Sequence, residues 1–297
     1  MNRILVIKLS ALGDVVQAFG PFAAIRAHHP DAHITLLTTP PFAALLEGSP
    51  WFDAIRADGR PGWGNIGALL RLARGLGGAG FSRVYDLQTS GRSSRYRWFV
   101  PGAEWSGIAR GASHPHANPA RDAMHTLDRQ REQLEMAGIR HFPAPDLSWL
   151  DADLSRFRLP TRFALMVPGA SAARPGKRWP VERFAKVAMG LGMPSVVVGG
   201  PSESGLAAAI PGALDLCGKT SLRELGAIAR RAALCVGNDT GPTHLAAACG
   251  TPTLAIFGEE SDPALCAPRG PAVSVLRGNP IGAVSAAAAL AALPYRP

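Results

Sequence analysis

The sequence predicts an α/β protein built from two doubly wound parallel-sheet domains that face a cleft. A length of 297 residues suits two domains of about 150 residues each. Short apolar runs alternate with helical periods of about ten residues, which is typical of parallel sheets covered by helices on both faces. The alternation stops at residues 139–162, which are Pro-rich and aperiodic. We expect a linker there, and domains at residues 1–150 and 151–297.

Each expected strand is a short apolar run, most of them rich in Val, Ile or Leu. Strands are expected at residues 4–9, 34–38, 84–87, 163–167, 195–198, 233–236, 253–257 and 273–276. The expected helices carry apolar residues at helical spacing, except for the last one, which rests on its Ala-rich composition. Helices are expected at residues 15–27, 64–76, 124–137, 181–191, 222–231, 242–249 and 281–293.

Composition excludes several classes of protein. Hydrophobic residues make up 47% of the chain and charged residues 18%, so it is neither disordered nor fibrous. No apolar run is long enough for a membrane-spanning helix, and Lys8 and Asp14 interrupt the apolar N-terminal stretch, which we interpret as a strand rather than a signal peptide. The four cysteines form no C-x-x-C pair, which favours reduced thiols in a cytoplasmic protein. The net charge of +9 favours anionic partners.

Two glycine-rich stretches resemble nucleotide-binding motifs in their letters but not in their structural context or spacing. Residues 75–80 fit G-x-G-x-x-G, but they follow a helix and precede a strand, the reverse of a dinucleotide fingerprint. Residues 169–177 lack the spacing of a P-loop, and Arg178 stands where Ser or Thr is required. We therefore interpret the first stretch as a helix stop and a turn.

Three other segments follow predicted strands, at the sheet edge where open α/β sheets bind ligands. Residues 10–14 bring Gly13, which permits close approach of a ligand, and Asp14, which is either a helix N-cap or a functional acid. Residues 168–180 offer a hydroxyl and three cations, either for a phosphate or as a solvated loop. Residues 236–248 place Asp239, Thr240 and His244 at a helix start that we expect at Pro242, although His244 could be purely structural.

Together these three segments resemble the heptosyltransferase family, glycosyltransferase family 9. The likeness rests on Ser-x-Leu-Gly-Asp at residues 10–14, the Pro-Gly-Ala-Ser…Lys-Arg-Trp-Pro loop at 168–180 and Asp-Thr-Gly-x-x-His at 239–244, and it runs to about residue 270. The resemblance implies a GT-B fold with two Rossmann-like domains, the N-terminal one for the acceptor and the C-terminal one for the nucleotide-sugar donor. It implies inverting transfer of a heptose from ADP-heptose to a hydroxyl of inner-core lipopolysaccharide (Kdo/heptose-lipid A).

The resemblance also implies a role for each matching residue. Asp14 corresponds to the general base. The others correspond to donor contacts: Ser171 and Lys177 to the phosphate loop, Glu203 to a ribose contact, Thr220 to an adenine-side contact, and Asp239, Thr240, Gly241 and His244 to the sugar-phosphate motif. Lys177 is also expected to assist catalysis by stabilising the leaving diphosphate.

The expected partners follow from this chemistry. We expect no required metal or other cofactor, because cationic groups can serve the diphosphate. The acceptor is expected to be an anionic, lipid-linked saccharide, with the enzyme cytoplasmic or peripheral on the inner face of the cytoplasmic membrane and not bound to nucleic acid. Residues 83–121 hold six arginines and two acids, so Arg92, Arg95 and Arg97 are candidates for contacting that acceptor, or ordinary surface.

Other functions remain open from the sequence. A sugar-nucleotide epimerase of GT-B fold would convert the donor without an acceptor. A GT-B transferase could use another sugar or a protein acceptor. A non-catalytic binding module would use the positive charge but would have no need of an acid at Asp14.

Overall fold

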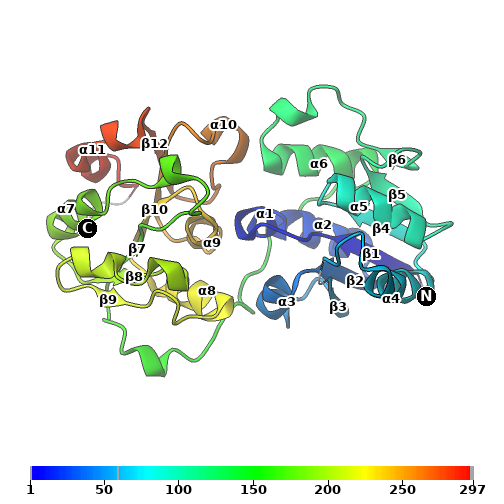
Figure 1. Cartoon of the computed structure of the whole chain (residues 1–297), viewed down its shortest axis with the longest axis horizontal. Helices are drawn as coiled ribbons and strands as arrows, with labels where there is room; N and C mark the ends of the chain where they lie inside the picture. Colours follow the sequence, from blue (N-terminus) through cyan, green and yellow to red (C-terminus); the bar gives the residue numbers. More distant parts are fainter. Residues whose placement is uncertain (1, 59, 295–297) are drawn as a thin grey trace. The chain divides into compact units, whose positions relative to one another are not determined.

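The chain forms two compact α/β units. The structure, a computed structural model, describes residues 2–58 and 60–294. The units are Met1–Trp149 and Leu150–Pro297, and each contains one sheet flanked by helices (Figure 1). Which substrate each unit binds stays a prediction.

The N-terminal sheet is parallel throughout and has the strand order β3-β2-β1-β4-β5-β6. Its strands are β1 Arg3–Ile7, β2 His33–Thr38, β3 Ala54–Ala57, β4 Arg83–Asp86, β5 Glu104–Gly107 and β6 His114–Pro115. Its helices are α1 Leu12–Val16, α2 Phe19–His28, α3 Pro40–Leu46, α4 Ile66–Gly77, α5 Gly91–Arg95 with the 3-10 turn η1 Tyr96–Phe99, and α6 Thr126–Met136.

The C-terminal sheet repeats this order as β12-β11-β10-β7-β8-β9 and is also parallel. Its strands are β7 Ala164–Val167, β8 Ser195–Val197, β9 Leu214–Asp215, β10 Leu234–Asn238, β11 Thr253–Phe257 and β12 Val273–Arg277. Its helices are α7 Val181–Leu191, α8 Leu222–Arg231, α9 Gly241–Ala248, α10 Pro263–Cys266 and α11 Ala286–Ala291.

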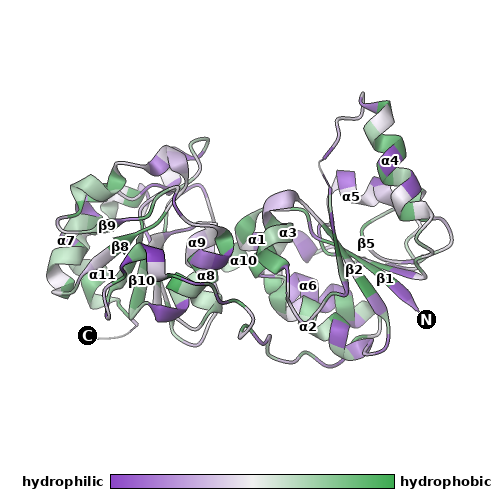
Figure 2. Cartoon of the chain, turned by 90° about the horizontal axis from the view of Figure 1, so that it is seen from below, coloured by the Kyte–Doolittle hydropathy of each residue, from purple (hydrophilic) through white to green (hydrophobic). Residues whose placement is uncertain are grey.

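Both sheets therefore have the Rossmann order, in which the chain reverses its direction of travel beside the first strand. That switch point lies between β1 and β4 in the N-terminal unit and between β7 and β10 in the C-terminal unit. Among the central strands, β7 is buried and hydrophobic throughout and β1 is so from Ile4 on (Figure 2). Loops that follow these strands converge at one edge of each sheet, where a ligand site forms.

The structure confirms the doubly wound class and contains every strand expected from sequence. It also contains β3, β5, β6 and β9, which were not expected. The last three are short or interrupted by Gly, Pro or charged residues, and β3 is only partly buried at the sheet edge. Such strands show no hydrophobic pattern because they are held by pairing with a neighbour.

Two helix predictions were wrong in extent. The helix expected at residues 15–27 is two helices, α1 and α2, that break at Gln17 and Ala18. Pro21 explains the break, because it has no N–H to donate to the Gln17 carbonyl and its ring would clash there. The helix expected at 281–293 is the shorter α11, which begins after Ser285, whose side chain accepts the Ala288 N–H.

The remaining structural expectations concern turns, thiols and membrane helices. α4 ends at Gly77 and the chain turns through Gly80 at φ +66°, so the glycines at 75–80 are a helix stop, as expected. The four cysteines, all within the described residues, form no disulfide, and Cys249 and Cys266 are only partly buried. Among the described residues, no helix has the length and hydrophobicity needed to cross a membrane.

Candidate functional site

Asp14 lies in the first turn of α1, directly after the central strand β1. Its Oδ2 accepts the Ala11 N–H at 3.0 Å. The expectation that Asp14 is the N-cap was wrong, because α1 begins at Leu12 with Ala11 as N-cap. A short apolar Ala cannot accept a helix N–H, so the carboxylate three residues on takes over part of the capping. Asp14 remains partly exposed and available to a ligand.

The loop that carries Asp14 is fixed from the neighbouring strand β4. Gln88 Oε1 accepts the N–H groups of Leu9 and Ser10, at 2.7 and 3.1 Å. Asp86 in turn accepts the N–H groups of Gln88 and Thr89, both at 3.1 Å. The two loops at the N-terminal switch point therefore hold one another in place.

A polar cavity of about 190 Å³ lies beside Asp14. Lys8, Arg121 and Arg129 line it together with the acids Asp14 and Asp122. Lys8 is 4% exposed, and its Nζ donates to the Leu87 carbonyl at 3.0 Å. Burial lowers the pKa of Lys8, against the opposing charge of Asp14. Two buried nitrogens of Arg121, Nε and Nη2, have no hydrogen-bond partner among the described residues. Such a cavity suits an anionic group.

The buried carboxyl of Asp86 gives the unit a measurable pH dependence. Burial raises the pKa of Asp86 to about 6, although hydrogen bonds from Ser93, Thr89 and Gln88 oppose this. An unfolded Asp titrates near about 4, so the folded state holds the proton more tightly between these values. The free energy of unfolding should therefore fall as the pH rises from about 4 to above 6, and then level off.

We expect Asp86→Asn to remove this dependence, because an amide does not ionise. The free energy of unfolding of the variant, relative to that of the wild type, should rise by up to about 3 kcal/mol between about pH 4 and pH 8. Urea unfolding of both proteins across that range measures the difference. A difference that stays constant with pH would show that Asp86 does not titrate in this window.

In the C-terminal unit, Asp239 joins Lys177 and His244. Its Oδ2 accepts from Lys177 Nζ at 2.5 Å, and its Oδ1 lies 3.2 Å from His244 Nε2. Asp239 and His244 are each 6% exposed. Burial acts to raise the pKa of Asp239, but hydrogen bonds from His244 and Lys177, with their charges, lower it to about 2. A fixed carboxylate thus holds the ammonium group of Lys177 at the switch point.

This cluster lies at the start of α9. The helix begins at Gly241 with Thr240 as N-cap, so Pro242 is its second residue and not the first, as was expected. The first N–H groups of a helix have no partner within it and favour an anion. Thr240 and Gly241 therefore provide a partial positive charge beside Lys177 and Asp239.

The sequence reasoning missed Asn238, which organises the cluster. Its side chain is fully buried, accepts the Trp179 N–H at 3.1 Å and donates to the Pro168 carbonyl at 2.7 Å. Thr243 Oγ1 donates to the Asn238 carbonyl at 2.7 Å. A polar residue ending an otherwise apolar strand is the signal that could have revealed it. Asn238 fastens both ends of the loop at residues 168–180 to β10.

The other predicted donor residues lie on adjacent loops of the same unit. The Glu203 carboxylate accepts the Gly200 N–H at 2.7 Å. It lies so close to Gly169 that a Cβ added there would be 1.9 Å from Glu203 Oε1. Thr220 follows Gly218, whose N–H donates to the Gly199 carbonyl at 2.8 Å. Ser171 is exposed on the loop that follows β7. The structure thus joins Lys177, Asp239 and His244 directly, and places Glu203 and Thr220 on neighbouring loops.

Asp14 belongs to the N-terminal unit. The same unit contains three further functional candidates that were not among the predicted site residues: Lys8, Gln88 and Arg129. A single Lys at the end of an apolar strand was the available signal for Lys8. No group of three or more His, Cys, Asp or Glu side chains suited to a metal ion occurs within residues 2–58 and 60–294.

Two parallel sheets of Rossmann order, each with polar residues at its switch point, are the architecture of the GT-B fold. The sequence model of glycosyltransferase family 9 (heptosyltransferase) matches residues 69–285. The chain belongs to this family.

Individual relatives agree with this assignment. The chain is 26% identical over 275 residues to lipopolysaccharide heptosyltransferase 3 of Escherichia coli K12, covering 83% of this chain and 79% of that protein. The family 9 glycosyltransferase structure from Veillonella parvula superposes with a TM-score of 0.82 at 23% identity, over 98% of this chain and 95% of the other. E. coli heptosyltransferase WaaC with ADP gives 0.74 at 20% identity, over 96% and 97%.

Proposed function

We propose that this enzyme transfers a heptose from ADP-heptose to a hydroxyl of an inner-core lipopolysaccharide acceptor (Kdo/heptose-lipid A), with inversion at the anomeric carbon. The observation that carries the proposal is the placement of complementary groups at the two switch points: an accessible acid, Asp14, in one unit and the Lys177–Asp239–His244 cluster in the other. Structures of the related E. coli heptosyltransferase WaaC contain ADP and ADP-2-deoxy-2-fluoro heptose.

In the proposed reaction, Asp14 takes the proton of the acceptor hydroxyl as its oxygen attacks the anomeric carbon. The bond from that carbon to the diphosphate oxygen breaks, and ADP leaves with the electron pair. Lys177 and the N–H groups at the start of α9 stabilise the charge that develops on the diphosphate. Asp239 and His244 keep Lys177 in position, while Glu203 and Thr220 bind the nucleoside and Ser171 a phosphate. This route needs no metal or other cofactor.

The cavity beside Asp14 is proposed to hold an anionic group of the acceptor. Lys8, Arg121 and Arg129 outnumber the two acids that line it, and two buried nitrogens of Arg121 find no hydrogen-bond partner in the part of the chain that the structure describes. A carboxylate or phosphate accepts two parallel hydrogen bonds from an Arg guanidinium. The anionic substituent would then orient the acceptor hydroxyl toward Asp14.

We expect Arg129→Gln to raise the acceptor KM about tenfold with little change in kcat, because it removes one charged contact in the cavity. ADP binding, measured by calorimetry, should not change. Arg131→Gln on the same helix is the matched control, since Arg131 is paired with Glu135 at the surface. An unchanged KM for Arg129→Gln would show that the cavity does not bind the acceptor.

The proposed location is the cytoplasm, peripheral on the inner face of the membrane that carries the lipid-linked acceptor, with no nucleic acid partner. The proposal is tested by measuring ADP release from ADP-heptose with and without a Kdo-lipid A acceptor. Acceptor-dependent release supports it. Donor conversion without an acceptor would instead support an epimerase, and transfer only from another nucleotide sugar or only to a protein would support the other transferases.

A further inference from the structure

Helix α4 lies on the N-terminal unit with most of its surface uncovered. Leu76 is its only buried residue, while Ile66 is 67% exposed and Leu70 is 47% exposed. Ile66 and Leu70 are four residues apart and therefore lie on the same face of the helix. The helix is apolar on a side where the unit provides no packing partner.

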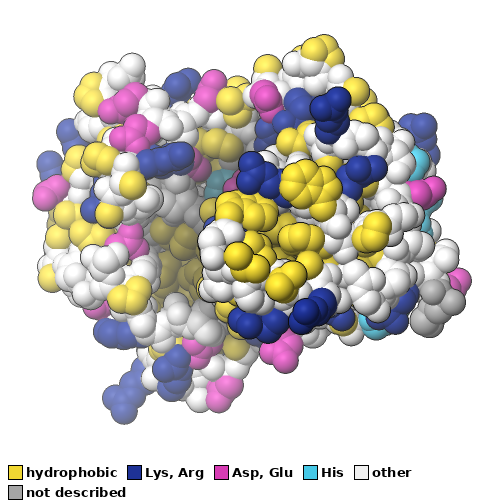
Figure 3. Space-filling model, turned by 45° about the vertical axis from the view of Figure 1, so that its right-hand side comes forward, with side chains coloured by type: hydrophobic (Ala, Val, Ile, Leu, Met, Phe, Trp, Pro, Cys, Tyr) yellow, Lys and Arg dark blue, Asp and Glu magenta, His cyan; other side chains and the backbone are white. Residues whose placement is uncertain are grey.

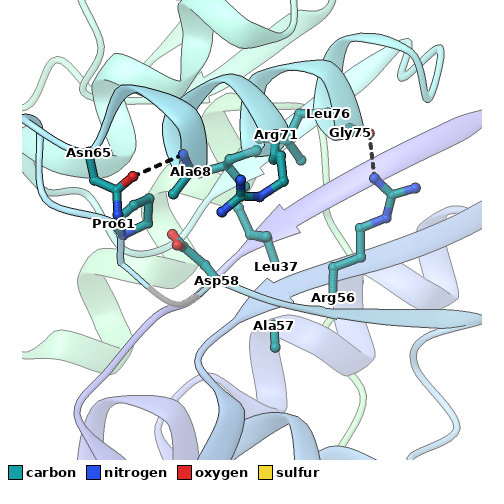
Figure 4. A pocket seen from close by; sticks show the side chains of 11 residues that line it. Leu37, Arg56, Ala57, Asp58, Pro61, Asn65, Ala68, Arg71, Gly75 and Leu76 are labelled. Carbon is teal, nitrogen blue, oxygen red and sulfur yellow. Dashed lines mark hydrogen bonds between the residues drawn. The ribbon is translucent and has the colours of Figure 1, made fainter.

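A cavity of about 460 Å³ separates α4 from strands β2 and β3 (Figure 4). Leu37 and Asp58 line it from below, and Arg71 projects into it from α4 (Figure 4). At one end, the Arg56 side chain donates to the Gly75 carbonyl. The C-terminal half of α4 is anchored in the core of the unit, where Leu76 is buried and Leu72 packs beside it, whereas Ile66 and Leu70 in the N-terminal half stay uncovered.

Two exposed tryptophans lie on segments next to α4. Trp63, just before α4, is 41% exposed, and the guanidinium carbons of Arg92 and Arg95 lie 5.2 and 5.0 Å from its ring centre. Trp98 on η1 is 75% exposed, and η1 packs against α4. We call Trp63, Ile66, Leu70 and Trp98 the α4 face.

The part of the sequence that carries the α4 face is rich in arginines and poor in acids, although Arg83 is paired with Glu104. Residues 60–103 contain a single acidic residue, Asp86, which is fully buried. The same residues contain seven arginines: Arg60, Arg71, Arg74, Arg83, Arg92, Arg95 and Arg97. Figure 3 shows hydrophobic side chains gathered on the forward side of the N-terminal unit, with Lys and Arg side chains at their border.

We propose that the α4 face docks on the surface of a bilayer that contains anionic lipids. Tryptophan rings lie at the level of lipid headgroups, and Ile and Leu side chains enter the acyl boundary. Arginines next to them are attracted by anionic headgroups. A nucleic acid would be attracted by the same charge but would not need exposed Ile and Leu side chains. This inference takes from the proposed function only the idea that the enzyme associates with a membrane. It assigns that association to a defined surface.

The test is co-sedimentation of the purified full chain with vesicles of phosphatidylcholine alone or with about one third phosphatidylglycerol. The wild type should bind the anionic vesicles at least about tenfold more tightly than the neutral ones. Ile66→Ser/Leu70→Ser/Trp98→Ser should lose about tenfold in binding to anionic vesicles, because it removes the apolar contacts. Arg92→Gln/Arg95→Gln should weaken binding to anionic vesicles by a similar factor, and the binding that remains should depend less on salt.

Matched controls lie on the C-terminal unit. Met189→Ser removes an exposed hydrophobic side chain, 62% exposed, and Arg231→Gln an exposed arginine; neither should change vesicle binding. Equal binding by the wild type and the triple variant, or no binding to anionic vesicles, would overturn the proposal. So would binding to an RNA oligomer that outcompetes the vesicles and survives the triple substitution.

The outcome is independent of transferase activity, because co-sedimentation uses neither donor nor acceptor. The triple variant should also keep its kcat and KM on a soluble, deacylated acceptor. Loss of vesicle binding with unchanged soluble activity supports the α4 face. Loss of soluble activity without loss of vesicle binding would assign these residues to the active site instead.

Discussion

Replacement of Asp14 by Asn is expected to lower kcat by about 10²- to 10⁴-fold while leaving the Kd for ADP nearly unchanged. The amide has a similar shape, and its oxygen can still accept the Ala11 N–H that Asp14 accepts at 3.0 Å. What it loses is the ability to take a proton from the acceptor hydroxyl. Steady-state kinetics and calorimetry on the same preparation measure both quantities.

The control for Asp14→Asn is Asp31→Asn, which should not change kcat. Asp31 is an exposed acid just before β2, at the amino ends of the strands, whereas Asp14 follows the carboxyl end of β1. A lower melting temperature with full residual activity would show that Asp14 only caps α1. Full activity with unchanged stability would equally exclude it as the base.

Replacement of Lys177 by Ala is expected to weaken ADP binding by about 10- to 100-fold, because a hydrogen bond to a charged phosphate is lost. Adenosine, which has no phosphate, should bind within about twofold of the wild type. Titration calorimetry with both ligands gives the ratio. Equal losses for the two ligands would contradict the assignment of Lys177 to the diphosphate.

The substitution also leaves Asp239 with one partner fewer, so thermal unfolding must accompany the binding measurement. Lys186→Ala provides the control, since Lys186 is exposed on α7 in the same unit and should affect neither ligand. In the double variant Lys177→Ala/Asp239→Asn, stability should partly recover because no buried carboxylate is left without its ammonium partner, while ADP binding should stay weak.

The central strands and the switch-point loops were predictable because their signals are local. β1, β7 and β10 are continuous apolar runs, and the residues that follow them carry glycines and charges. The edge strands β6 and β9 are two residues long and depend on neighbours distant in sequence, so no local pattern announces them.

The support of the site was harder to predict than its reactive groups. Asp239 and His244 lie five residues apart, and a helix start explains their proximity. Lys177 reaches Asp239 across 62 positions, and Gln88 reaches Leu9 across 79. Contacts of this kind are set by the order of strands in the sheet. Asn238 could have been noticed as a polar residue at a strand end, but the loops that Gln88 and Asn238 fix follow only from the folded structure.

Product analysis distinguishes heptose transfer from donor epimerisation. The enzyme would be incubated with ADP-L-glycero-β-D-manno-heptose and a series of truncated core acceptors, and the products analysed by mass spectrometry and by NMR of the new anomeric centre. We expect one heptose to be added, in the α configuration, to an acceptor that carries a carboxylate or phosphate. A β-linked product, or an epimerised donor with no acceptor consumed, would contradict this expectation.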